Sequence, residues 1–116
     1  MNDRTNAASG ETRVEKLKEM LDFQQQAIVS RMLVKNAAGS VTLFAFDKGE
    51  GLSEHTAPFD ALLIGVEGEA EVRVGADTHR LGEGETLLIP AGAPHAVAPC
   101  SQFKMLLVML KGERKA

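Results

Sequence analysis

The sequence predicts an all-β fold, a single antiparallel barrel or sandwich of short strands preceded by a short N-terminal helix. Runs of β-branched and apolar residues recur from residue 27 onward, at spacings that suit a sandwich or closed barrel rather than alternating strands and helices. Gly, Pro, Asn and Asp turn signals separate these runs. A length of 116 residues, 44% hydrophobic and 25% charged, is typical of one globular domain.

The N-terminal part divides into two segments. Residues 1–10 are small and polar without periodicity, and we expect them to be flexible. Residues 11–116 form the predicted domain. Within it, Thr12 and Glu15 have the spacing of a capping box, and the apolar residues that follow recur at helical spacing. A short amphipathic helix is therefore predicted over residues 13–22, with its apolar stripe docked on the barrel or on a second subunit.

About ten short strands are predicted after this helix. The clearest runs are residues 27–35, 41–46, 52–55, 60–67, 70–74, 78–81, 86–89, 95–98 and 103–110. The first two flank the turn signal Asn-Ala-Ala-Gly and are expected to pair antiparallel. Gly68 and Gly92 are expected at tight turns that need a positive φ.

Composition excludes several classes of function. A net charge of −3, no Trp or Tyr and only five Phe leave little for a nucleic-acid surface. The longest apolar runs have six residues, far below the roughly 20 that a membrane helix needs, so no membrane association is expected. Cys100 is the only cysteine and is predicted to be a small residue at a turn, and the polar N-terminus has no signal-like segment. The expected location is the cytoplasm.

Two stretches of the chain share the same features: two glycine turns, a short apolar strand, a proline and a histidine. Each delivers one histidine. The positions are Gly49, His55 and Gly68 in the first stretch and Gly84, Pro90, Gly92 and His95 in the second.

This spacing resembles the two sequence motifs of the cupin superfamily, which together would cover residues 49–99. In the second motif, Pro99 stands where Asn is usual; in the first, Ala57 and Ala61 replace the second His and the Glu. The resemblance implies a single barrel of the cupin 2 type, a jelly roll or double-stranded β-helix. It also implies a divalent metal held by four side chains, of which only His55 and His95 are present.

Strand alternation predicts where a ligand would lie. It places His55 and Ala57 on one face of their strand, and Ala61 and Leu63 on one face of the next. By the resemblance, that face lines the barrel cavity. The predicted ligand pocket therefore comprises both of these pairs together with His95.

Three roles remain open for the two histidines. They can be hydrogen-bonded polar residues at the barrel mouth, ligands of a weakly bound divalent transition metal, or general acid and base groups. Two imidazoles alone bind metal weakly, so no tightly bound cofactor is expected, although Glu54 or Asp60 could add a carboxylate. His79 is predicted to be a surface residue.

The leading functional hypothesis is a cupin that binds a small molecule in an apolar pocket carrying two histidines. A metal-dependent enzyme is an alternative, because the resemblance implies dioxygenases, isomerases and decarboxylases among the relatives. A structural or sensory dimer is a third. We expect a homodimer, because residues 105–110 are apolar on both faces and strand 27–35 could add to a partner's sheet.

Overall fold

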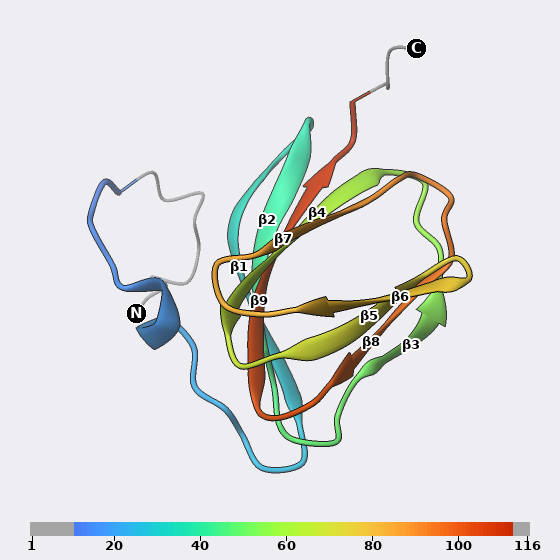
Figure 1. Cartoon of the computed structure of the whole chain (residues 1–116). Helices are drawn as coiled ribbons and strands as arrows, with labels where there is room; N and C mark the ends of the chain where they lie inside the picture. Colours follow the sequence, from blue (N-terminus) through green and yellow to red (C-terminus); the bar gives the residue numbers. More distant parts are fainter. Residues whose placement is uncertain (1–10, 113–116) are drawn as a thin grey trace.

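The computed structural model describes residues 11–112, which form two antiparallel sheets facing each other (Figure 1). The larger sheet has the strand order β1-β2-β9-β4-β7, and the smaller one β3-β8-β5-β6. The elements are η2 (Leu17–Glu19), β1 (Ile28–Asn36), β2 (Gly39–Phe46), β3 (Leu52–His55), β4 (Asp60–Glu67), β5 (Ala70–Val74), β6 (Asp77–Leu81), β7 (Thr86–Ile89), β8 (His95–Pro99) and β9 (Phe103–Leu110). The predicted all-β fold is confirmed.

The core lies between the two sheets. Phe46, Leu63 and Phe103 of the larger sheet share one buried cluster with Val72 and Val97 of the smaller sheet. Because successive side chains of a strand point to opposite faces, alternate residues of each strand enter this core and the others point outward.

The predicted strands are confirmed, with small differences at their ends. The first strand begins and ends one residue later than predicted, and the second begins two residues earlier. The hairpin between them is therefore tight: Asn36 pairs with Gly39, and the Asn36 side chain accepts a hydrogen bond from the Ala38 N–H at 2.8 Å. Gly68 and Gly92 have φ values of 77° and 84°, as expected for tight turns. No helix of residues 11–112 has the length and apolarity needed to span a membrane.

The prediction of an amphipathic helix over residues 13–22 is wrong. Only Leu17–Glu19 is helical, as a single 3₁₀ turn, and its N-cap residue Lys16 makes no side-chain capping bond. A helix of this length is marginal by itself, so tertiary contacts decide the local conformation. The predicted flexible segment, residues 1–10, lies outside the residues that the structure describes.

Those contacts come from the larger sheet. We call residues 16–23 the N-terminal strap; in Figure 1 it lies beside the larger sheet, on the side away from the smaller one. Lys104 of β9 donates a hydrogen bond from Nζ to the Lys18 carbonyl, and Arg31 of β1 donates from Nη1 to the Met20 carbonyl at 3.0 Å. Carbonyls that an α-helix would use internally are thus bonded to side chains of the sheet.

The strap covers one end of the outer face of the larger sheet. Lys104 is 5% exposed there, with its Nζ 4.8 Å from the centre of the Phe23 ring and 3.3 Å from Glu67 Oε1. Leu43 and Ala45, which point outward beside it, are fully buried. The outward-facing residues at this end of the sheet therefore form a second, smaller core.

Candidate functional site

The two motif histidines lie side by side. His55 of β3 pairs directly with His95 of β8, and their ring centroids are 4.2 Å apart with the planes inclined at 60°. His95 also pairs with Val74 of β5, which points its side chain into the core side of the smaller sheet. The structure thus joins two residues that are far apart in the chain, as the motif spacing predicted.

A β-bulge in β3 aims His55 at its partner. Leu52 pairs with Val97 and His55 with His95, so the step from one pair to the next takes three residues on β3 and two on β8. In a regular strand, residues three apart point to opposite faces. The extra residue restores the same face for both, so Leu52 packs on the core and His55 reaches His95. Sequence reasoning missed this bulge, because the run of residues 52–55 carries no Gly or other signal for it.

Main-chain carbonyls fix the orientation of both rings. Nδ1 of His55 lies 2.8 Å from the Ser53 carbonyl oxygen, and Nδ1 of His95 lies 2.9 Å from the Ala93 carbonyl oxygen. A carbonyl can only accept, so each Nδ1 carries the proton and donates. In the neutral rings, each Nε2 therefore presents a lone pair, and neither Nε2 bonds to any protein group within residues 11–112. Two acceptors sit together where the motifs meet.

Backbone contacts lock the two motif segments together next to the histidines. The Gly92 N–H donates to the Ala57 carbonyl at 2.8 Å, and the Ala91 N–H donates to Asp60 Oδ1 at 2.9 Å. Asp60 therefore serves to hold the turn that precedes His95. These bonds join the loop after β3 and the first residue of β4 to the loop after β7, so the positions of the two histidines depend on each other.

The apolar residues of the predicted pocket come from different places. Ala61 and Leu63 lie on the inner face of β4, in the opposite sheet, and both are buried in the core. Ala57 is half-buried in the loop between β3 and β4. Leu63 is 2% exposed, so it fills core space and does not line an open pocket.

The donor set does not fit a metal held by three or four side chains. Residues 11–112 contain no group of three or more His, Cys, Asp or Glu side chains suited to a metal ion. Glu54, which sequence reasoning kept as a reserve ligand, forms an ion pair with Arg73 of β5. Both of these side chains are exposed on the outside of the smaller sheet. At this place the described residues therefore offer a metal two imidazoles, where stable sites use three or four ligands.

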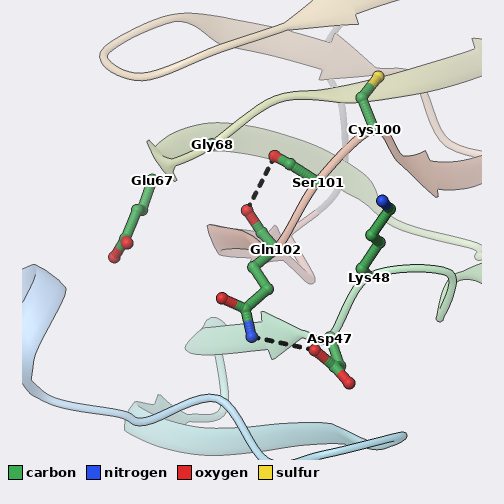
Figure 2. A pocket seen from close by; sticks show the side chains of 7 residues that line it. All are labelled: Asp47, Lys48, Glu67, Gly68, Cys100, Ser101 and Gln102. Atoms are coloured by element: carbon green, nitrogen blue, oxygen red, sulfur yellow. Dashed lines mark hydrogen bonds between the residues drawn. The ribbon is translucent and has the colours of Figure 1, made fainter.

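A separate hollow of about 580 Å³ lies away from the histidines (Figure 2). Its lining residues are Asp47, Lys48, Glu67, Gly68, Cys100, Ser101 and Gln102. Gln102 Nε2 donates to Asp47 Oδ1 at 3.0 Å, and the Gln26 N–H donates to Asp47 Oδ2 at 2.7 Å. These bonds, with that from Gln26 contributing most, lower the pKa of Asp47 below its ordinary 3.8. The Asp47 carboxylate thus bonds both to Gln26, which precedes β1, and to Gln102, which precedes β9. We therefore interpret this region as structural.

Cys100 at the rim of this hollow has a charged neighbour that the sequence does not show. Arg80 arrives from β6, and its pKa is raised first by its hydrogen bond to Glu69 and then by electrostatic attraction to Cys100. In the sequence, no Lys, Arg or His directly precedes or follows Cys100. The cysteine is exposed, and residues 11–112 contain no disulfide involving it.

Two facing antiparallel sheets around one core, with a histidine pair where two Gly-Pro segments meet, define a small jelly-roll barrel. The family model of the cupin domain matches residues 42–110, and the chain belongs to the cupin family. Both sequence motifs and all of the strands from β3 to β9 lie in the matched range.

Solved structures agree with this assignment. A conserved protein of unknown function from Streptococcus pyogenes is 36% identical, with a TM-score of 0.83 over 90% of this chain and 91% of that one. A cupin superfamily protein from Desulfitobacterium hafniense is 28% identical, with a TM-score of 0.82 over 86% and 92%. A cupin 2 conserved barrel domain protein from Leptotrichia buccalis is 39% identical, with a TM-score of 0.77 over 81% of this chain and 46% of that one. No curated protein matches the chain.

Proposed function

We propose that this cupin binds a small organic molecule at the His55–His95 pair. The observation that carries the proposal is the hydrogen-bonding pattern that the two rings share. Each Nδ1–H is used by a backbone carbonyl two residues earlier, and each Nε2 is left for a ligand. Two acceptors whose rings lie 4.2 Å apart can receive hydrogen bonds from one ligand group or from two adjacent groups.

The proposal also specifies the chemistry of the ligand. A ligand has to donate hydrogen bonds to the Nε2 atoms of the two neutral imidazoles, so hydroxyl, amide or amine groups fit the pair. Its remaining part meets an apolar wall, because Ala57 and Ala61 supply only methyl groups at the positions that flank the histidines in the motif. Apolar walls with a few fixed polar groups are the usual composition of small-molecule sites.

A metal-dependent enzyme remains the alternative of a different class. The same two lone pairs could ligate a divalent metal, with the ligand and water supplying the other donors. The described residues do not provide a third or fourth protein ligand, so we place this alternative second. A dimer with a purely structural or sensory role is a third, and would not require a ligand at the histidines.

The test uses the histidine side chains as reporters. Small polar compounds carrying O–H or N–H groups are screened by NMR on the full chain with labelled histidine rings. Binding should move the ring signals of His55 and His95 but not those of His79, the exposed histidine of β6. The variants His55→Ala and His95→Ala should each weaken binding about tenfold, the equivalent of one lost hydrogen bond.

His79→Ala is the matched control and should bind as the wild type does. Compounds that bind without moving either motif histidine would contradict the proposal. So would affinities that stay the same in all three variants.

A further inference from the structure

The guanidinium group of Arg31 uses one of its nitrogens and leaves the other two without a partner. Nη1 donates a hydrogen bond to the Met20 carbonyl at 3.0 Å, which holds the N-terminal strap. Nε is buried and has no hydrogen-bond partner, and Nη2 bonds to no group of residues 11–112. Nε and Nη2 share one edge of the planar guanidinium, and their N–H bonds along that edge are parallel. A whole donor edge is therefore left for a further partner.

Arg31 also has no negative charge beside it. Lys104, the other cation that holds the strap, forms an ion pair with Glu67 at 3.3 Å. Within residues 11–112, Arg31 forms no ion pair. A buried donor without a partner destabilises the folded state, and native proteins rarely contain one. An anion that accepts from Nε and Nη2 together would satisfy the donor and offset the charge.

Arg31 belongs to the wall of a hollow of about 460 Å³ at the free edge of β1. Met20 and Leu21 of the strap line it together with Ser30, Arg31 and Met32 of β1. Three of these five side chains are apolar, and the guanidinium is the only charged one. Hollows of this volume, with apolar walls and few polar groups, are typical sites of small molecules. The flexible methionine side chains can move to admit an oxygen atom to the buried Nε.

We propose that this hollow binds a small organic carboxylate. The two carboxylate oxygens match the two parallel donors of Arg31, the bidentate geometry for which arginine is best suited. The carbon chain of the ligand lies against Met20, Leu21 and Met32. Because the ligand contacts both the strap and β1, it holds the strap on the sheet.

This site is separate from the histidine pair. Arg31 belongs to the larger sheet, whereas His55 and His95 belong to the smaller one. The two sites also select opposite chemistry, since the neutral imidazoles accept hydrogen bonds and the guanidinium donates them. The inference therefore does not rest on the ligand proposed for the histidines.

The test is an NMR titration of the ¹⁵N-labelled full chain with butyrate at constant ionic strength. Millimolar butyrate should shift the Nε–H signal of Arg31 and the amide signals of residues 16–23. Butyramide, the neutral analogue of the same shape, should leave these signals in place. Acetate should bind about tenfold more weakly than butyrate, because it lacks the two CH₂ groups that contact the apolar wall.

Three variants separate the contributions of charge, geometry and the apolar wall. Arg31→Lys keeps the positive charge but loses the paired donors, and should weaken butyrate binding about tenfold. Met32→Ala should weaken the binding of butyrate but not that of acetate. Arg73→Lys, at an exposed arginine that pairs with Glu54 on the smaller sheet, is the matched control and should bind butyrate as the wild type does.

Far-UV circular dichroism verifies that each variant is folded, and the wild-type titration with Met32→Ala tests the site even if Arg31→Lys is not. An Arg31 signal that butyrate does not move, or that butyramide moves equally, would overturn the inference. So would a folded Arg31→Lys variant that binds butyrate as the wild type does. Inorganic phosphate that binds as tightly as butyrate would overturn the assignment to an organic carboxylate, in favour of an inorganic anion.

Discussion

His55 lies directly opposite His95 in the β3–β8 ladder, and each ring turns its Nδ1 toward a main-chain carbonyl two residues before it. This arrangement predicts that both neutral rings adopt the Nδ1–H tautomer, with Nε2 unprotonated. Long-range ¹H–¹⁵N NMR spectra at alkaline pH distinguish a protonated from an unprotonated ring nitrogen and so check this directly. His79, whose ring has no such backbone partner within residues 11–112, is the internal reference.

The variants His55→Ala and His95→Ala assign the signals. An Nε2–H tautomer in both motif histidines would contradict the orientation argument. It would also remove the basis for a ligand that donates hydrogen bonds to this pair.

Lys104 links the strap to the sheet, and its removal should release the strap. Lys104→Ala loses the hydrogen bond to the Lys18 carbonyl and the contact with the Phe23 ring. We expect a loss of about 1–3 kcal/mol in the free energy of unfolding, the usual value for a buried charged hydrogen bond. Amide hydrogen exchange should accelerate in residues 16–23 and stay unchanged in the smaller sheet. Lys35→Ala, at an exposed lysine of β1, is the control and should change neither quantity.

Much of the fold follows from the sequence, because strand alternation and turn residues are local signals. The runs over residues 60–67, 70–74, 86–89 and 103–110 form strands with those bounds. The same spacing placed one histidine in each motif, and the pairing of β3 with β8 brings the two together. The pair at the centre of the candidate site was therefore predictable.

The strap was not predictable, because its conformation is decided by residues far away in the chain. The local capping-box pattern favoured a helix, whereas the carbonyl of Lys18 is bonded to Lys104, 86 positions later. The bulge that aims His55 depends likewise on the register with β8. Local propensity is a weak prior wherever a distant side chain takes the backbone hydrogen bonds.

A side chain at Gly68 should lower the free energy of unfolding more than one at Gly92. Both have a positive φ, so Gly68→Val and Gly92→Val should each lose about 1–3 kcal/mol through backbone strain. A Cβ at Gly68 would also lie 2.1 Å from the Gln102 carbonyl oxygen, whereas a Cβ at Gly92 would have nothing within 4 Å. Gly68→Val should therefore be the more destabilised in chemical denaturation.

Asn at each of the two positions is the matched control, since Asn tolerates a positive φ better than Val does. Gly92→Asn should recover most of the lost stability and Gly68→Asn should not. Equal behaviour of the two positions would show that the contact with Gln102 is relieved by movement of the loop.

Asp47 should make the stability depend on pH in the acid range. Its carboxylate accepts hydrogen bonds from the Gln26 N–H and the Gln102 side chain, which lower the pKa in the folded state below 3.8. A depressed pKa contributes stability above the unfolded-state pKa, and this contribution is lost as the pH falls through the folded-state pKa.

Asp47→Ala should therefore be less stable than the wild type at neutral pH. The difference in free energy of unfolding between the wild type and Asp47→Ala should become smaller below pH 3.8, the ordinary pKa of the carboxyl group. Chemical denaturation at a series of pH values measures this. Asp47→Asn keeps an acceptor for the Gln26 N–H and should lie between them. A gap that does not change with pH would contradict the role of the charged carboxylate.

The last prediction concerns metal. A cupin site of the usual kind would need a histidine at position 57 and a glutamate at position 61, and this chain has Ala57 and Ala61 there. Methyl groups cannot ligate, and the two carboxylates that the sequence offers as further ligands have other partners, that of Glu54 with Arg73 and that of Asp60 with the Ala91 N–H. Without a carboxylate, no negative charge offsets a dication next to the apolar core.

We therefore expect the purified protein to keep clearly less than one equivalent of Zn, Ni, Mn, Fe or Cu after dialysis against EDTA. Elemental analysis of the wild type, His55→Ala and His95→Ala measures this, with His79→Ala as the matched control for metal bound at a surface imidazole. Metal that remains in substoichiometric amounts should depend on both motif histidines, because their rings lie 4.2 Å apart and each Nδ1 is already used by a backbone carbonyl. One full equivalent that survives chelation and is abolished by both substitutions would overturn this expectation. The metal-dependent enzyme would then become the leading hypothesis, with water or the ligand supplying the donors that residues 11–112 do not provide.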